Sequence, residues 1–119
     1  MRSRRNFLLT VAGSALAALA QQSAKTGSLE RVDPKYVCFV TKYRFYTRQL
    51  PVAIAGKTYY GCGNMCRAKL KGDASQRSDI DPVSGQKVDK ATAVVGADSQ
   101  GNVYFFENVE NLKKYKPAL

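Results

Sequence analysis

Histidine is absent from the 119-residue chain. This absence removes the side chain that most often serves as an acid–base group in catalysis and as a nitrogen ligand for metals. No serine or carboxylate stands in a recognisable catalytic pattern, so we predict that the protein is not an enzyme. Cysteine is scarce: Cys38, Cys62 and Cys66 are the only three, and they include no CxxC pair of the kind that makes thiol oxidoreductases efficient.

A long apolar run is also lacking. The longest, at residues 7–20, has fourteen residues and contains polar interruptions, so it is too short to span a bilayer comfortably. It follows three arginines and ends in Ala18-Leu19-Ala20, which is typical of a signal peptidase site. We therefore predict a cleaved signal peptide at residues 1–20 and a mature chain from Gln21; the alternative is a buried N-terminal helix.

Residues 3–9, SRRNFLL, resemble the twin-arginine export signal, with leucine where that signal often has lysine. The resemblance implies a bacterial-type cell, export of an already folded chain and a periplasmic location.

The mature chain is strongly basic. Without the three arginines of the leader it keeps 16 basic residues against 9 acidic ones, a net charge of +7. An exported protein rarely meets nucleic acid, so we expect no nucleic-acid partner. The charge instead indicates contact with an anionic membrane surface or an acidic partner, or it serves only solubility.

The three cysteines are expected to converge. Residues 36–40, YVCFV, have the β-branched and aromatic content of a buried strand with Cys38 in its middle. A hairpin is predicted from residues 51–55 and 58–61, joined at Gly56-Lys57. This hairpin would return the chain beside the strand that carries Cys38.

The other two cysteines follow the hairpin directly. Cys62 and Cys66 are four residues apart, which places both sulfurs on one face at the start of a helix. Asn64 is the predicted cap of that helix and Gly72 its left-handed end. The glycines on either side of Cys62 are expected to let the backbone approach a bound ion closely.

The second half of the chain repeats the first. GNVYFFENVENLKKY, from Gly101, aligns with GKTYYGCGNMCRAKL, from Gly56, at an offset of 45. The packing residues remain in the second copy while the thiols are lost. Ser84, Glu107 and Asn111 are predicted to occupy the positions of Cys38, Cys62 and Cys66 without binding metal.

We therefore predict an α+β fold of two small ββα, treble-clef-like units that arose by internal duplication and share one core. A flexible lead-in is expected at residues 21–32, a metal-binding unit at 33–72 and a structural unit at 73–119. In the structural unit, Asn108 is the expected helix cap and Pro117 the stop.

Several short motifs resemble known metal-binding domains. Cys38, a gap of 23 residues and the sequence CGNMC ending at Cys66 resemble the TRASH domain, which is linked to heavy-metal sensing, trafficking and resistance. Residues 81–88, DPVSGQKV, and 101–106, GNVYFF, are similar to the related YHS domain with its first cysteine replaced by serine. The gap is slightly longer than the usual TRASH spacing, which an insertion at residues 44–50 would explain. The resemblance covers most of residues 33–116 and implies heavy-metal binding by the three cysteines.

Three thiolates without a nitrogen donor favour a soft ion. Cu(I) suits a trigonal three-sulfur site, whereas Zn(II) is the second choice because it requires a fourth ligand. Met65 is the nearest soft candidate for that ligand, and the alternative is that it packs in the core.

The sequence thus predicts a periplasmic metallochaperone that carries Cu(I) to a periplasmic metalloenzyme or metal transporter. The periplasm is oxidising, so a disulfide between Cys62 and Cys66 is an open alternative, as are inert cysteines in a core. In the disulfide case the protein would be a non-catalytic accessory subunit of a larger periplasmic redox complex. The oligomeric state stays open.

Overall fold

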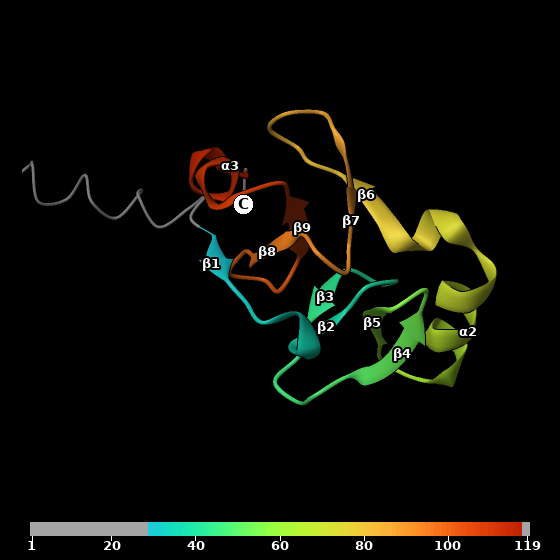
Figure 1. Cartoon of the computed structure of the whole chain (residues 1–119). Helices are drawn as coiled ribbons and strands as arrows, with labels where there is room; N and C mark the ends of the chain where they lie inside the picture. The colour runs from blue at the N-terminus through green and yellow to red at the C-terminus, as the bar shows by residue number, and fades with distance from the viewer. Residues whose placement is uncertain (1–28, 118–119) are drawn as a thin grey trace, which may run out of the picture.

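A computed structural model describes residues 29–117, and the predicted signal peptide lies outside them. These residues form a small α+β globule with short antiparallel sheets and two α-helices (Figure 1). The strands are β1 (Glu30–Arg31), β2 (Val37–Cys38), β3 (Tyr43–Arg44), β4 (Leu50–Ile54), β5 (Lys57–Gly61), β6 (Ser78–Ile80), β7 (Lys87–Asp89), β8 (Val94–Ala97) and β9 (Val103–Phe106). The helices are the 3-10 helices η3 (Pro34–Tyr36) and η4 (Ala74–Arg77) and the α-helices α2 (Asn64–Gly72) and α3 (Val109–Lys114).

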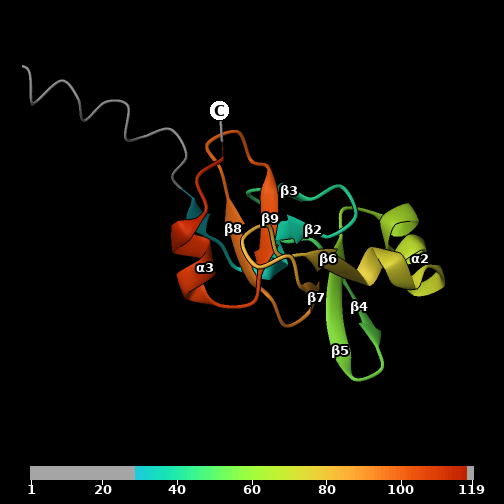
Figure 2. The ribbon, with the colours of Figure 1, turned by 90° about the horizontal axis from the view of Figure 1, so that it is seen from above.

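The order of elements repeats within the described residues. After β1 the chain forms η3, the hairpins β2-β3 and β4-β5, and helix α2; it then forms η4, the hairpins β6-β7 and β8-β9, and helix α3. The two helices begin 45 residues apart in sequence, at Asn64 and Val109, which is the offset of the sequence alignment. They lie at opposite ends of the molecule in both views (Figures 1 and 2).

One apolar core joins the two halves. Phe39 and Phe105 are fully buried, and their rings meet edge to face with centroids 5.5 Å apart. Tyr59 and Tyr60 place their rings against Phe39 as well. The core contains Val37, Phe39, Val52, Tyr59 and Leu70 from the first half and Val88, Val95, Ala97, Val103 and Phe105 from the second. Each half therefore buries its apolar face against the other.

Strand β1 is an element that the sequence did not predict. It lies within the expected flexible lead-in, yet it pairs with β8, with Glu30 opposite Ala97 and Arg31 opposite Gly96. That expectation was wrong for these two residues. The partner strand lies more than sixty residues downstream, so no local pattern signals the pairing.

The first hairpin and helix also depart in detail from the prediction. The β4-β5 turn is formed by Ala55 and Gly56, with φ of 53° and 79°, and Lys57 already belongs to β5. A turn with both central residues at positive φ matches the right-handed twist of the paired strands. Asn64 is the first residue of α2, whose cap is Gly63, and Gly72 lies inside the helix and not in the left-handed region.

The second helix follows the prediction at its start. The Asn108 side chain caps α3 by accepting a hydrogen bond from the Asn111 amide at 2.8 Å. The helix ends at Lys114, three residues before Pro117. No helix of the described residues is long and apolar enough to cross a membrane.

Candidate metal centre

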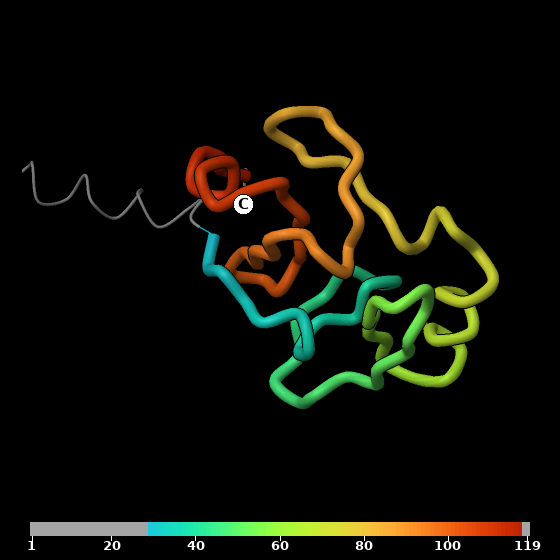
Figure 3. The backbone as a smooth tube through the Cα atoms, in the orientation of Figure 1, coloured from blue at the N-terminus to red at the C-terminus, as the bar shows by residue number. Residues whose placement is uncertain are grey.

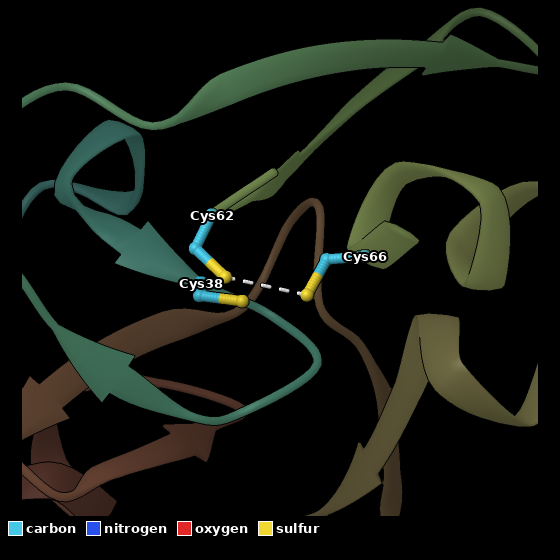
Figure 4. Close-up of side chains that lie close together, drawn as sticks. All are labelled: Cys38, Cys62 and Cys66. Atoms are coloured by element: carbon cyan, nitrogen blue, oxygen red, sulfur yellow. Dashed lines mark hydrogen bonds between the residues drawn. The ribbon is translucent and has the colours of Figure 1, made fainter. Parts of the chain in front are cut away.

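The three cysteine sulfurs meet at one point of the fold. Cys38 comes from β2, Cys62 directly follows β5, and Cys66 lies in the first turn of α2 (Figure 4). Their Sγ atoms all lie within 4.8 Å of one another, and those of Cys62 and Cys66 are 3.4 Å apart. All three are free thiols. The predicted convergence is confirmed, and these residues could hold a metal ion.

Burial differs across the cluster. Cys38 is fully buried, Cys66 is half-buried and Cys62 is exposed. Because the deepest sulfur lies in the core and the outermost is open to solvent, an ion bound here would be reached from the side of Cys62.

Local packing explains how β5 and α2 come so close. The amide of Phe39, just after Cys38, donates to the Tyr60 carbonyl at 2.9 Å, which ties the Cys38 segment to β5. A methyl group at Gly61 would lie 2.8 Å from Cβ of Cys66, so only glycine allows this approach. Gly63 has open space around it, so no protein contact requires glycine there, and its predicted approach to a bound ion stays a prediction.

The pKa of Cys38 is low for a buried thiol. Burial raises it, but hydrogen bonds from the Thr41 side chain and backbone outweigh that effect, and the amides of Cys62 and Val40 add to them. The Thr41 amide lies 3.5 Å from the sulfur. The resulting pKa of about 7 means that a large fraction of Cys38 is thiolate near neutral pH. Thiolate is the form that binds metals.

The pKa of Cys62 depends on the two neighbouring sulfurs, which lie close to it. The hydrogen bond to Cys66 raises the pKa of Cys62 to about 12, with further contributions from burial and from the charge of Cys38. Cys62 therefore keeps its proton while Cys38 is ionised. A metal cation would compensate the negative charges and replace the protons, as metal binding to thiols does in general.

A carboxylate occupies the place of Cys38 in the second half. Asp81, fully buried, accepts hydrogen bonds from the amides of Val83 and Ser84 at 2.7 and 3.1 Å. It also accepts from the Glu107 amide at 2.8 Å and from Asn111 Nδ2 at 2.9 Å. Val83, Ser84 and Glu107 match Val40, Thr41 and Cys62, which donate to Cys38, and Asn111 stands at the position of Cys66.

Asp81, and not Ser84, is thus the counterpart of Cys38, and the predicted equivalence of Ser84 was wrong. The β6-β7 hairpin has six loop residues against four in β2-β3, so the offset of 45 does not hold at its start (Figure 3). Burial raises the pKa of Asp81, but its hydrogen bonds outweigh this and lower it. In both halves the hydrogen-bond donors therefore favour an anion, the Cys38 thiolate in one half and the Asp81 carboxylate in the other.

A buried lysine lies beside the cluster, and sequence reasoning missed it. Lys90 is 3% exposed, and its Nζ donates to the Phe39 carbonyl at 2.7 Å. Burial lowers its pKa, while the negative charges of Asp79 and Cys38 oppose that shift. Nothing in the surrounding sequence, KVDKATAVV at residues 87–95, indicates that Lys90 will be buried.

Met65 does not pack in the core. It is 77% exposed in the first turn of α2, between Cys62 and Cys66 in sequence. The alternative of a core methionine was wrong, and a role as fourth ligand stays a prediction.

Comparison with protein-family models, with curated proteins and with solved structures found no match. The resemblance to TRASH and YHS domains is therefore not supported by a family assignment. The cysteine geometry carries the functional argument.

Proposed function

We propose that the protein is a non-catalytic metallochaperone of the periplasm that binds a soft metal ion, Cu(I) in preference to Zn(II), through Cys38, Cys62 and Cys66. It passes the ion to a metalloenzyme or a metal transporter. The observation that carries this proposal is the meeting of three free sulfurs within 4.8 Å of one another.

The donor set favours Cu(I). Three thiolates match the preference of Cu(I) for soft ligands and a low coordination number. Zn(II) is usually held by four ligands in structural sites, and with no histidine in the chain the fourth would have to be Met65, water or a carboxylate. Copper therefore ranks above zinc.

The shape of the site supports transfer in addition to storage. Cys38 anchors the ion in the core, and the exposed Cys62 offers an incoming ligand a route to it. The proposal includes an internal duplication of ββα, treble-clef-like units, in which the second unit replaced its thiols and kept a structural role. The repeated order of elements and the corresponding hydrogen-bond donors around Cys38 and Asp81 support a duplication.

A second function rests on the 3.4 Å separation of the Cys62 and Cys66 sulfurs. Such a separation is short enough for oxidation to a disulfide after a small movement. The protein would then be an accessory subunit of a periplasmic redox complex, with that disulfide as a structural link.

Anaerobic titration of the mature protein separates the two functions. We expect one Cu(I) per chain, three reactive thiols in the apo form, and displacement of bound Zn(II) by Cu(I). The preference follows from the all-sulfur donor set. One reactive thiol per apo chain, with no copper uptake until a reductant is added, would instead support the subunit function.

A further inference from the structure

The charges of the chain are divided unevenly between its two halves. Residues 34–72, which contain the three cysteines, include eight basic residues and no acidic one. Residues 73–117 include seven acidic and six basic residues and are close to neutral. The positive charge therefore belongs to the half that carries the metal centre.

Half of these eight basic residues are paired. Lys42 and Lys57 each reach an aspartate of the second half at 2.7 Å, Asp79 and Asp89. Lys35 and Arg44 pair with Asp33 and Glu30, just before the first half. The other four, Arg48, Arg67, Lys69 and Lys71, form no ion pair with any residue that the structure describes.

Three of these four lie on helix α2. Lys69 and Lys71 are exposed, and Arg67 is half-buried and contacts the Asn64 side chain at 3.3 Å. The same helix supplies Cys66. Helix α2 lies at one end of the molecule, with η4 beside it and Arg77 of η4 donating to the Leu70 and Lys71 carbonyls (Figure 2). Within residues 34–72, the unpaired positive charge is thus mostly on the helix that supplies Cys66. Lys113, Lys114 and Lys116 form a second basic group, at the end of α3 and far from the cysteines, and they too make no ion pair within residues 29–117.

The exposed soft atoms lie at the start of the same helix. Cys62 is exposed, and Met65 is 77% exposed. Since Cys38 is fully buried, a ligand that takes over the ion has to enter from this side. Lys69 lies one turn after Met65 and Cys66, on the side of this entrance, whereas Arg67 and Lys71, one turn apart, lie on another side of the helix. We call these three residues the basic surface of α2.

We propose that the basic surface of α2 is a docking site for an acidic protein that brings soft ligands of its own and exchanges the metal ion with the cysteine cluster. The proposal rests on the proposed function and adds the kind of partner. Complementary charge accelerates encounter and fixes orientation, and here it would bring the partner's ligands to Cys62.

A protein fits the basic surface of α2 better than a membrane does. Three basic residues contribute roughly 3 kcal/mol to binding an anionic bilayer, and recognised lipid-binding clusters contain about four to eight. Helix α2 exposes no large apolar side chain besides Met65. Phospholipids also supply no thiolate or thioether to accept a soft ion.

The test measures Cu(I) transfer to two synthetic peptides. Both contain the same two-cysteine segment, flanked by glutamates in one peptide and by lysines in the other. At low ionic strength we expect the parent to transfer Cu(I) to the glutamate peptide at least about tenfold faster than to the lysine peptide. The difference should vanish at about 1 M salt, where the screening length is about 3 Å.

A pair of matched variants locates the effect. Lys69→Glu with Lys71→Glu reverses two charges on α2, and Lys114→Glu with Lys116→Glu makes the same change 45 residues later, at and just beyond the end of α3. We expect the first variant to lose the preference for the glutamate peptide and the second to keep it. An unchanged preference in the first variant, or an equal loss in both, would overturn the proposal.

Two further readings separate the remaining outcomes. Copper content is measured first, since failure to load copper refutes the proposed function. In that case the docking site is still tested by the binding of the peptides to the apo protein, which fluorescence anisotropy measures. If vesicles of phosphatidylglycerol bind the parent but not the α2 variant while the peptides show no preference, the basic surface of α2 binds membranes and the acidic-protein proposal is wrong.

Discussion

Replacing Cys38 by serine is expected to weaken Cu(I) binding by more than roughly a hundredfold, because loss of an outer-shell partner alone costs about 10–100-fold and this change removes a ligand. Serine is a hard donor that stays protonated, so it cannot stand in for the thiolate. The structure places this sulfur within 4.8 Å of the other two. Competition with a Cu(I) chelator under anaerobic conditions measures the loss.

Two further variants test whether the loss of Cu(I) binding results only from damage to the fold. Cys38→Asp copies Asp81, whose carboxylate accepts from the corresponding amides, so we expect it to fold and yet to lose Cu(I) binding. Cys62→Ser alters an exposed position, and we expect a loss similar to that of Cys38→Ser. The double variant should be little worse than either single one, because a two-thiol remnant already lacks the site. Parent-like affinity in Cys38→Asp would contradict the three-thiolate site.

Replacing Asp81 by alanine is expected to reduce the free energy of unfolding by about 3 kcal/mol, because buried donors left without a partner cost about 1–3 kcal/mol each. The Glu107 amide and the buried Asn111 side chain would each lose an acceptor. The amides of Val83 and Ser84 lie in an exposed loop, where water can replace the carboxylate. Urea unfolding of parent and variant measures the difference.

Acid should reduce this difference. The pKa of Asp81 is lowered in the folded protein, so its stabilisation is complete above the unfolded pKa of about 3.9 and is lost as pH falls through the folded value. Asp73→Ala is the control, since it removes an exposed carboxylate that accepts from nearby Ser75, and we expect a much smaller effect. An Asp81→Ala variant as stable as the parent at neutral pH would show that the carboxylate does not hold the second half together.

The sequence predicted that the three cysteines meet, and the parts that bring Cys62 and Cys66 together are local. The hairpin that ends at Gly61 and the spacing of Cys62 and Cys66 are encoded within a few residues, and turn and helix signals report them. The offset of 45 likewise predicted the order of elements in the second half and the cap of α3.

The features that the sequence did not reveal depend on contacts between distant segments. Strand β1 pairs with β8, and Lys90 donates to Phe39 across 51 positions of the chain. The sequence alignment did not reveal the role of Asp81 because it compares residue types, and an aspartate does not resemble a cysteine. The structure shows that both residues accept hydrogen bonds from corresponding backbone amides. A loop two residues longer moves that anion out of the aligned position.

Counting the ligands of the bound ion tests the central claim most directly. X-ray absorption at the copper edge, on mature protein loaded with one equivalent of Cu(I) without oxygen, reports the number and kind of donor atoms. Three sulfur donors and no nitrogen or oxygen donor are expected in the parent, falling to two sulfurs in Cys62→Ser. Two sulfurs in both proteins, or a nitrogen or oxygen donor in the parent, would contradict a site built from Cys38, Cys62 and Cys66.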